Sequence, residues 1–450
     1  MNIDLQARYR DERLPRYTSY PTAPHFSPDV SASHYGAWLA SLGPGATGSL
    51  YLHVPFCRSM CWYCGCHTTI TKHDAPIVDY LTVLRREIEA VADRLERPLP
   101  VCHVHFGGGT PTIMTPDEFG RLMDLLAARF AIAPDAEIAV EIDPRTLTPE
   151  MTTALGSNGV TRASLGVQSF DPVVQRAINR VQTVAQTAAA MEGLRAAGVR
   201  GINFDLIYGL PHQTLESCWD TVAACLDMAP DRFAVFGYAH IPSFKRHQRM
   251  IDEAALPDGA ARHAQAEAIA DALQAAGYRR IGLDHYALPS DPMVRAHRDG
   301  RLRRNFQGYT TDTADALLGF GASAIGRLPQ GYVQNAVGLG DYAARIGAGG
   351  LATIKGYVLT DDDRLRADLI ERIMCDFAVD IASIARCHQL DPAAVFRAFP
   401  RLAALQADGL VERRGHEVCV AASALHLVRT VASAFDAYLE MPGRTYSRAV

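Results

Sequence analysis

Three cysteines within one short stretch are the clearest chemical signal in the sequence. Cys57, Cys61 and Cys64 follow a C-x3-C-x2-C spacing in the segment CRSMCWYC. Three thiolates on one loop can bind three irons of a [4Fe–4S] cluster, which leaves the fourth iron open to an external ligand. The spacing therefore predicts an iron–sulfur centre that can engage a small molecule directly.

Three other uses of these cysteines remain open at this point. A structural zinc site normally takes a second C-x2-C pair from another loop, and the sequence has no second pair. A bacterial ferredoxin run has C-x2-C-x2-C spacing and ends in Cys-Pro, which is also not found here. Cys61 and Cys64 could instead form a redox dithiol. The spacing favours the cluster over these alternatives.

Composition and charge exclude several classes of protein. Of 450 residues, 48% are apolar and 21% charged, and the formal charge is −5. Proteins that bind nucleic-acid backbones are normally basic, so no nucleic-acid partner is expected. No run approaches ~18 consecutive apolar residues, and the start of the chain has no apolar signal region. We therefore expect a cytoplasmic protein that neither spans a membrane nor carries a secretory signal.

From residue 49 onward, apolar strand-like runs alternate with helical patterns. Such alternation predicts an α/β fold with a parallel sheet, here a partial (β/α)6 TIM-like barrel. Helical patterns lie near residues 75–95, 116–130, 148–157, 184–197 and 214–228, with a further helix at 258–276. The expected strands are Ser49–Val54, Val101–Phe106, Glu137–Ile142, Arg162–Gln168, Gly201–Tyr208 and Arg232–Tyr238.

Polar or glycine residues lie at or near the end of each expected strand. In parallel α/β sheets, ligands bind at the carboxyl ends of the strands. The same edge should therefore carry the cysteine loop and the other chemically active residues. In chain order these are Cys57, Gly107–Thr110, Glu141 with Asp143, Gln168, Asp205, and Ala239 with His240.

The chain is expected to divide into three segments. Residues 1–48 form a proline-rich arm, 49–355 the catalytic domain, and 356–450 a mainly helical, winged-helix-like domain. The last domain is predicted to hold helices at about 361–377, 380–388, 392–407 and 423–439, with a hairpin near Gly415. Residues 301–312 are expected to form a loop, and 319–326 and 347–350 turns.

Several longer motifs resemble a known family. The cysteine spacing, the segment YLHVPFC ending at Cys57 and the segment GGGTPT of residues 107–112 resemble radical S-adenosylmethionine (SAM) enzymes. Within that superfamily the chain is similar to oxygen-independent coproporphyrinogen III oxidases, from about residue 15 to 440. The motifs that carry this likeness are the added Cys66, the Pro15–Pro21 arm, Ser164–Gln168, Asp205–Pro211 and Asn305–Thr311.

The resemblance implies an anaerobic step of haem synthesis. Two propionates of coproporphyrinogen III would be oxidatively decarboxylated to vinyl groups by a 5′-deoxyadenosyl radical, giving protoporphyrinogen IX. The implied cofactors are one [4Fe–4S] cluster and two SAM molecules. The implied electron donor is a low-potential carrier such as a flavodoxin or ferredoxin. The sequence has no heptads or evident apolar stripe, which favours a monomer.

The resemblance also assigns roles to individual residues. Cys57, Cys61 and Cys64 would ligate the cluster, whereas Cys66 would not. Tyr51, Cys66 and Glu141 would lie at the catalytic centre, with Cys66 near the substrate or in an electron relay; the alternative for Cys66 is an inert buried thiol. We expect free N–H groups in the glycine turn to approach the methionine part of SAM. The SAM contacts would be Tyr51, Tyr63, Gly108, Gly109, Thr110, Glu141, Gln168, Arg180, Asp205, Ala239 and Ile325.

Two rival functions remain at this level. One is a haem-trafficking or haem-degrading radical SAM relative, which would usually lack the second C-x-C cysteine and the N-terminal arm. The other is a non-catalytic iron–sulfur binding protein with a C-terminal winged-helix module. Such a protein would bind a cluster but would not cleave SAM.

Overall fold

The structure is a computed structural model, which describes residue 9 and residues 12–439. The chain forms two compact units. The barrel unit comprises Phe26–Ala276 and Ala314–Val358, and the terminal unit comprises the residues up to His25, Gly277–Thr313 and the chain from Leu359. This division differs from the three consecutive segments expected at 1–48, 49–355 and 356–450, because both units are assembled from separated stretches of chain.

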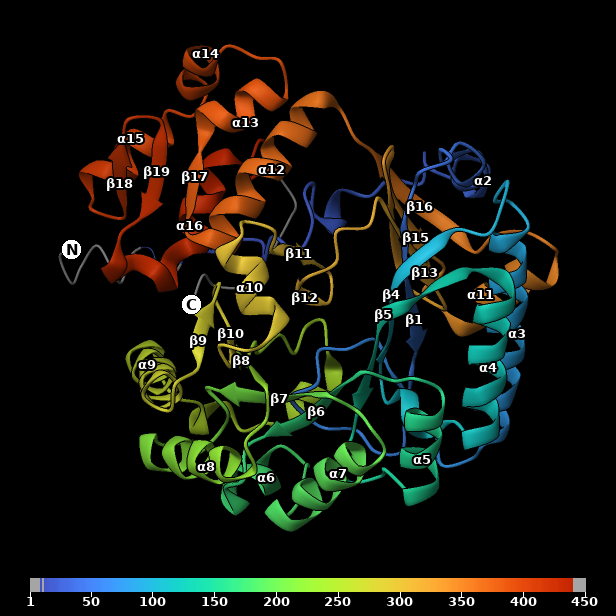
Figure 1. The fold of residues 1–450 in the computed structure, drawn as a ribbon. Coiled ribbons are helices and arrows are strands. Elements are labelled where there is room, and N and C mark those ends of the chain that lie inside the picture. Colours follow the sequence, from blue (N-terminus) through green and yellow to red (C-terminus); the bar gives the residue numbers. More distant parts are fainter. Residues whose placement is uncertain (1–8, 10–11, 440–450) are drawn as a thin grey trace. The chain divides into compact units, whose positions relative to one another are not determined.

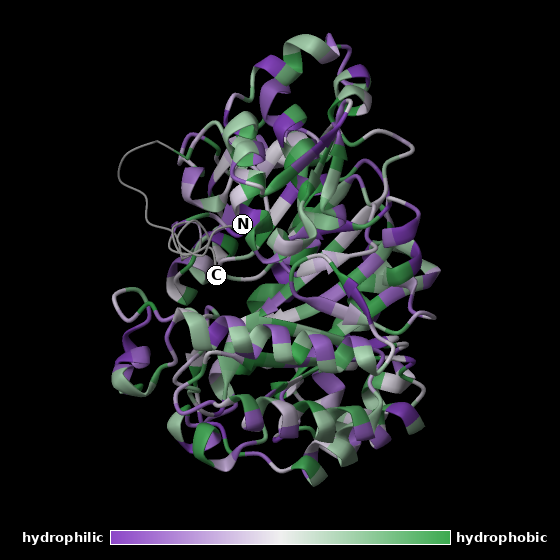
Figure 2. Ribbon diagram, turned by 90° about the vertical axis from the view of Figure 1, so that its left-hand side faces the viewer, coloured by the Kyte–Doolittle hydropathy of each residue, from purple (hydrophilic) through white to green (hydrophobic). Residues whose placement is uncertain are grey.

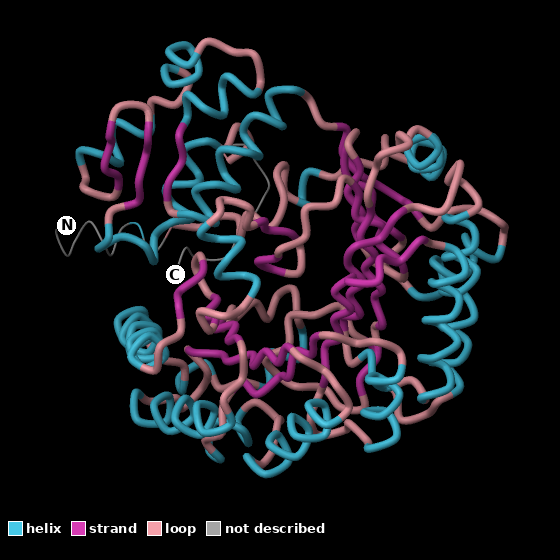
Figure 3. The backbone as a smooth tube through the Cα atoms, viewed as in Figure 1, coloured by secondary structure: helices cyan, strands magenta, loops and turns pink. Residues whose placement is uncertain are grey.

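The six expected strands form the parallel part of the sheet in the barrel unit (Figure 1). They pair in chain order with parallel register, so all six carboxyl ends lie at one edge. The sheet is curved and open, and its helices lie on the convex side (Figure 3). The strands are β1 (Gly48–Val54), β4 (Pro100–Gly108), β5 (Ala131–Ile142), β6 (Arg162–Gln168), β7 (Gly201–Tyr208) and β8 (Arg232–Gly237).

The expected helices are also present, and local sequence explains where they start. Thr115, Thr183 and Thr214 each accept a hydrogen bond from a backbone N–H in the first turn of the helix that follows. The helices show alternating apolar and polar bands, whereas the strands are mainly apolar (Figure 2). The expected helices are α3 (Ala75–Ala92), α4 (Pro116–Arg129), α5 (Pro149–Ser157), α7 (Val184–Ala196), α8 (Leu215–Met228) and α9 (Gly259–Ala275). The short α6 (Pro172–Ala177) was not predicted.

The sheet continues beyond the parallel strands on the side of β1. Strand β13 (Ala316–Phe320) pairs with β1 in parallel, and β14 (Ile325–Leu328), β15 (Gly331–Asn335) and β16 (Thr353–Val358) follow in antiparallel order. The turn predicted at 319–326 is therefore confined to residues 321–324, because the predicted range also includes the end of β13 and the start of β14. Position 319 of β13 requires glycine, because a Cβ there would lie 2.5 Å from the Ile325 carbonyl oxygen on the neighbouring strand.

A buried carboxylate ties helix α3 to this extension. Glu87 is 1% exposed, and its Oε2 accepts hydrogen bonds from the Gly321 N–H (2.6 Å) and the Tyr342 hydroxyl (2.7 Å). Its Oε1 accepts from Asn335 Nδ2 (2.6 Å). Burial raises the pKa of Glu87 to about 7, against the lowering effect of these three donors. The network joins α3, the turn that follows β13, β15 and α11 (Leu339–Gly347).

The terminal unit has a core of its own. Tyr17 and Tyr20 of the N-terminal segment pack in one cluster with Leu369, Ile373 and Phe435. Helices α12 (Asp361–Asp376) and α13 (Ile381–Cys387) occur as predicted, and β18 (Val411–Arg414) and β19 (Glu417–Val420) form the expected hairpin. The hairpin gains a third strand, β17 (Ala378–Asp380), which supports the winged-helix-like description.

Three predicted elements of the terminal unit differ in the structure. The helix expected at 392–407 is broken at Pro400 into α14 (Pro392–Arg397) and α15 (Arg401–Ala407), because proline cannot donate within a helix. The helix expected at 423–439 is reduced to α16 (Val428–Ala432), flanked by 3-10 turns η5 (Ala422–Leu427) and η6 (Ser433–Phe435). The expected loop at 301–312 contains a hairpin, β11 (Arg303–Asn305) with β12 (Gly308–Thr310).

Within the described residues, the structure has no helix that is both long and apolar enough to cross a membrane.

Candidate active site

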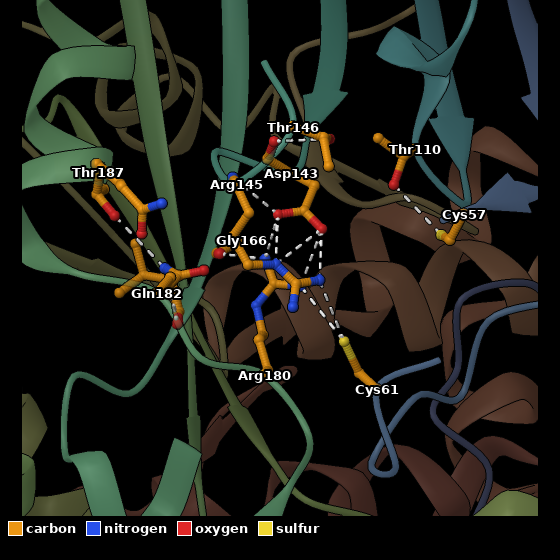
Figure 4. Close-up of polar contacts among 12 residues, drawn as sticks. Cys57, Cys61, Thr110, Asp143, Arg145, Thr146, Gly166, Arg180, Gln182 and Thr187 are labelled. Carbon is orange, nitrogen blue, oxygen red and sulfur yellow. Dashed lines mark hydrogen bonds and ion pairs between the residues drawn. The ribbon is translucent and has the colours of Figure 1, made fainter. Parts of the chain in front are cut away.

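The cysteine loop follows β1 at the carboxyl edge of the sheet. Its base is closed where β2 (Phe56–Cys57) pairs in parallel with β3 (Thr69–Ile70). The Cys57 Sγ lies 3.3 Å from Thr110 Oγ1 of the glycine turn (Figure 4). Cys61 is buried, and its Sγ receives Arg180 Nη1 at 3.5 Å and Arg145 Nη2 at 3.6 Å. Two guanidinium groups therefore face a sulfur that is predicted to carry negative charge.

The fourth cysteine of the loop contacts the third. Hydrogen bonds from the Cys66 thiol and backbone N–H lower the pKa of Cys64 to about 6, against the opposing effect of burial. The same thiol contact, together with burial of the sulfur, raises the pKa of Cys66 well above its usual value. Burial raises the pKa of Cys57 to about 11. Cys66 thus acts as a donor that favours the Cys64 thiolate.

The glycine turn after β4 packs against the cysteine loop at very close range. Gly108 has φ +115°, and a Cβ on Gly109 would lie 2.5 Å from the Phe56 carbonyl oxygen. The Gly109 N–H donates to the Val54 carbonyl (2.9 Å) and the Thr110 N–H to the Phe56 carbonyl (2.8 Å). The expectation of free N–H groups here was wrong, because these donors hold the cysteine loop against β4.

The third N–H of the turn is also occupied, by Glu141 at the end of β5. The Glu141 Oε2 accepts from the Gly108 N–H (3.0 Å), and Oε1 lies 3.3 Å from His105 Nε2. Burial would raise the pKa of this carboxyl, but His105 and the Gly108 N–H outweigh that effect and hold it below its usual value. Glu141 is therefore an ionised carboxylate, and its side chain is 38% exposed.

Tyr51 lies beside this carboxylate. A Cβ on Gly107 would come within 3.0 Å of both Glu141 Cδ and Tyr51 Cε2, so the absence of a side chain there makes room for both. The Tyr51 hydroxyl is 3.0 Å from His53 Nδ1, and the His53 Nε2 is 3.0 Å from the His67 carbonyl oxygen, to which it donates. The phenol is thus tied to the cysteine loop through His53.

An ion cluster lies next to the cysteine loop. Asp143 pairs with Arg145 (2.6 Å) and Arg180 (3.3 Å), and Arg180 Nη2 donates to the Gly166 carbonyl (2.6 Å), as Figure 4 shows. Although burial opposes it, the two guanidinium groups keep the pKa of Asp143 below its usual value. The sequence placed Asp143 at a strand end without a role and did not single out Arg145. Their link to Cys61 depends on side-chain reach that strand assignment does not give.

Two further polar side chains lie on the next strands. Gln168 ends β6 with φ +67°, and its buried Oε1 has no hydrogen-bond partner among the described residues. Asp205 on β7 accepts from Ser164 Oγ (3.1 Å) and Asn203 Nδ2 (2.7 Å). Burial first, and then the charge of Glu141, raise the pKa of Asp205 to about 7. The Nε of Arg180 is likewise buried and unpartnered within the described chain.

Comparison with known proteins agrees with this architecture. The sequence model of the Radical SAM superfamily matches residues 51–225, and that of the HemN C-terminal domain matches residues 359–426. An oxygen-independent coproporphyrinogen III oxidase from Bradyrhizobium diazoefficiens is 61% identical over 450 residues, which is 100% of both chains. The chain belongs to the family of oxygen-independent coproporphyrinogen III oxidases.

Other family members agree along the whole length. The oxygen-independent coproporphyrinogen III oxidase of Pseudomonas aeruginosa is 39% identical over 454 residues, covering 100% of this chain and 98% of its own. The solved structure of HemN, a coproporphyrinogen III oxidase and radical SAM enzyme from Escherichia coli, matches with a TM-score of 0.91 at 37% identity. It covers 95% of this chain and 100% of its own. The predicted α/β class is confirmed.

Radical SAM enzymes use a [4Fe–4S] cluster and SAM, and the residues found here fit both groups. Cys57, Cys61 and Cys64 are free thiols on one loop, and thiolates are the preferred ligands of iron–sulfur clusters. The unpartnered Gln168 Oε1 and Arg180 Nε are polar atoms that a bound ligand can satisfy. This edge of the sheet is therefore the candidate site for both groups.

A further segment holds the cysteine loop from the side of β8, and its residues His247 and Gln248 were not predicted from the sequence. We call residues 241–250 the clamp segment. Lys245 Nζ donates to the Cys66 carbonyl (2.9 Å), His247 Nε2 to the Cys64 carbonyl (2.7 Å) and Gln248 Nε2 to the Tyr63 carbonyl (3.0 Å). A pattern of three donors aimed at backbone oxygens leaves no signature in sequence.

The remaining predicted SAM contacts lie at the same edge. Tyr63 packs beside a buried cluster that includes Ile178 and Tyr238. The Ala239 carbonyl accepts from Gln248 Nε2 at 3.3 Å, just after β8. Ile325 begins β14, directly after the turn that follows β13. The fold thus collects all the predicted contacts at one end of the barrel unit.

Proposed function

We propose that the protein carries out the oxygen-independent oxidative decarboxylation of coproporphyrinogen III to protoporphyrinogen IX. Two propionate side chains would each lose CO2 and two electrons with one proton, which leaves vinyl groups. The proposal rests above all on full-length identity of 61% to a relative with this activity in its name. The cysteine loop and its guanidinium neighbours support it. The chemistry would reside in residues 49–355, in the cytoplasm.

Cys57, Cys61 and Cys64 would ligate three irons of the cluster. The cluster, when bound, supplies one electron that splits SAM into methionine and a 5′-deoxyadenosyl radical, which removes a hydrogen from the substrate. Arg145 and Arg180 hold positive charge against Cys61 and so stabilise the ligated sulfur. The substrate carbon that reacts would have to lie beside this same loop.

The polar residues at the strand ends would orient SAM. Glu141 is ionised and offers a carboxylate to the ammonium of the methionine part or to the ribose hydroxyls. Gln168 offers its free carbonyl oxygen, Asp205 a second carboxyl group and Arg180 its free Nε. The remaining contacts would be packing or close backbone approach, from Tyr63, Gly108, Gly109, Thr110, Ala239 and Ile325.

Two SAM molecules in one site would account for so many contacts. Tyr51, Cys66 and Glu141 would lie closest to the reacting atoms. Cys66 is an exposed residue whose thiol is hydrogen-bonded to Cys64, so it would stand at the boundary between the cluster and the substrate space. A monomer supplied with electrons by a small low-potential carrier would suffice, because every proposed site residue comes from one chain.

The decisive experiment is anaerobic incubation of the reconstituted protein with SAM, a reductant and coproporphyrinogen III. We expect protoporphyrinogen IX together with 5′-deoxyadenosine. A haem-trafficking or haem-degrading relative would cleave SAM without making this product. A non-catalytic iron–sulfur protein would release no 5′-deoxyadenosine at all. Either of these outcomes would overturn the proposal.

A further inference from the structure

The clamp segment has two chemically different sides. Its inward residues Lys245, His247 and Gln248 bind the backbone of the cysteine loop, as described above. Several of its other side chains are exposed to solvent. Phe244 is 79% exposed and Met250 is 59% exposed, and both arginines, Arg246 and Arg249, are exposed as well.

Charge sets this segment apart from the protein as a whole. The sequence of residues 241–250 (IPSFKRHQRM) contains one lysine, two arginines and no acidic residue, in a chain of net charge −5. The acidic residues that follow in the sequence, Asp252 and Glu253, lie outside this segment. Asp252 caps the Ala254 N–H, and Glu253 pairs with His240 at 3.0 Å. The exposed side of the clamp segment is therefore basic and apolar.

The shape of this surface favours a protein over a small molecule. Small ligands bind in concave pockets that bury most of their surface. An aromatic ring that is 79% exposed lies on a convex surface. Exposed aromatic residues and arginines are typical of protein interfaces, where aromatic anchors are buried on binding and arginines pair with acids.

We propose that Phe244, Arg246, Arg249 and Met250 form the docking surface for a small acidic electron carrier. The proposal rests on the proposed function, which requires an external one-electron donor. One electron leaves the reduced carrier, which is oxidised, and enters the cluster, which is reduced, with no proton transferred. Lys245, His247 and Gln248 connect this surface directly to the loop that holds the cluster ligands.

The test compares two reductants on the same reconstituted protein, with an acidic flavodoxin as the probe. The variants are Phe244→Ala and the double variant Arg246→Glu with Arg249→Glu. With reduced flavodoxin, we expect the rate of SAM cleavage to fall by about tenfold in the charge variant, because charged interface residues control association rates. With dithionite, which needs no docking surface, both variants should match the unchanged protein.

A binding measurement adds a readout that does not depend on turnover. Oxidised flavodoxin should bind the unchanged protein more weakly as salt rises, and the charge variant should lose most of this salt dependence. Trp219→Ala on α8 is the matched aromatic control, since Trp219 is 52% exposed there. Arg86→Glu on α3 is the matched charge control. Neither control should change either measurement.

Two results would overturn the docking surface. One is equal rates with flavodoxin for the variants and the unchanged protein. The other is an equal loss with both reductants, which would make the segment part of the substrate or cluster site. Failure of the unchanged protein to cleave SAM with dithionite would instead count against the proposed function.

Discussion

Two buried polar networks of the barrel unit contain the same chemistry but differ in how completely it is satisfied. Around Glu87, three donors meet both oxygens of one carboxylate, and no polar side-chain atom of that network is left buried without a partner in the described chain. At the carboxyl edge of the sheet, Gln168 Oε1 and Arg180 Nε stay buried and unpartnered within the same description. Glu87 and Asp205 both have a pKa raised by burial to about 7.

This contrast distinguishes buried polar groups that stabilise the fold from buried polar groups that are available to a ligand. A buried polar atom without a partner costs about 1–3 kcal/mol, so a folded chain retains one only where something else offsets the cost. The network around Glu87 is closed and joins elements of the fold. The network at the strand ends is open, and the missing partners are those that a ligand can supply. A shifted pKa alone does not distinguish the two.

The largest predicted effect concerns the cysteines. Cys61→Ala should abolish iron–sulfur binding and SAM cleavage, because two thiolates cannot hold the cluster in place of three. Cys225→Ala is the matched control, since Cys225 is fully buried in α8. It should keep its iron and lose only about 1 kcal/mol of stability. Iron and sulfide analysis after anaerobic reconstitution measures the cluster content of both variants. Full iron content in Cys61→Ala would refute the assigned ligand set.

The second prediction disrupts the closed network. Glu87→Leu leaves three buried donors without an acceptor and should lower the free energy of unfolding by about 3–5 kcal/mol. SAM affinity should not change in the protein that remains folded. Glu89→Leu on the same helix is the control, because Glu89 is exposed. Chemical denaturation of both variants checks the difference, and equal stability would mean that the network contributes nothing.

The third prediction concerns one side chain of the open network. Gln168→Leu removes the orphan carbonyl and should raise the Kd for SAM by about tenfold, the worth of one good hydrogen bond, with stability kept. Gln265→Leu is the matched control. Its amide is fully engaged, accepting from the Gly209 N–H (2.9 Å) and donating to the Gln213 carbonyl (2.8 Å). That variant should be destabilised with SAM affinity unchanged. The reverse pattern would contradict the comparison.

The smallest predicted effect is a pH dependence. The folded chain keeps Asp205 protonated up to about pH 7, whereas an unfolded aspartate ionises near pH ~4. Between these values the folded state binds more protons, so this group lowers stability as pH rises. Asp205→Asn removes the effect, and its Tm relative to the unchanged protein should therefore rise between pH 5 and pH 8. Glu87 contributes the same pH dependence of stability to both proteins, so its effect does not appear in the difference in Tm. A constant Tm difference would show that Asp205 has an ordinary pKa.

Much of the barrel unit could be predicted from the sequence. The hydrophobic periodicity of its strands and helices and the capping residues of its helices depend only on neighbouring residues in the chain. The strands ending at Val54, Ile142 and Gln168 were placed to within a residue at their carboxyl ends. Those ends determine which side chains meet, so the common edge of the site followed from the topology of parallel sheets.

The parts that failed depend on contacts between distant residues. Short antiparallel strands such as β14 and β17 have little pattern of their own and exist through their partners. The N–H donors of the glycine turn were expected to be free, but the carbonyl oxygens of Val54 at the end of β1 and of Phe56 accept hydrogen bonds from them. The function was predicted from the long motifs, because the spacing of three cysteines alone is compatible with several chemistries.

The discontinuity of the terminal unit has a consequence for how the protein is made. Its first stretch ends at His25, but its largest part begins only at Leu359. At ordinary rates of translation, Tyr17 and Tyr20 emerge from the ribosome roughly tens of seconds before the helices that bury them. Until then these aromatic side chains are exposed to chaperones and to non-native contacts. The N-terminal segment of the nascent chain therefore waits longest for the residues that bury it.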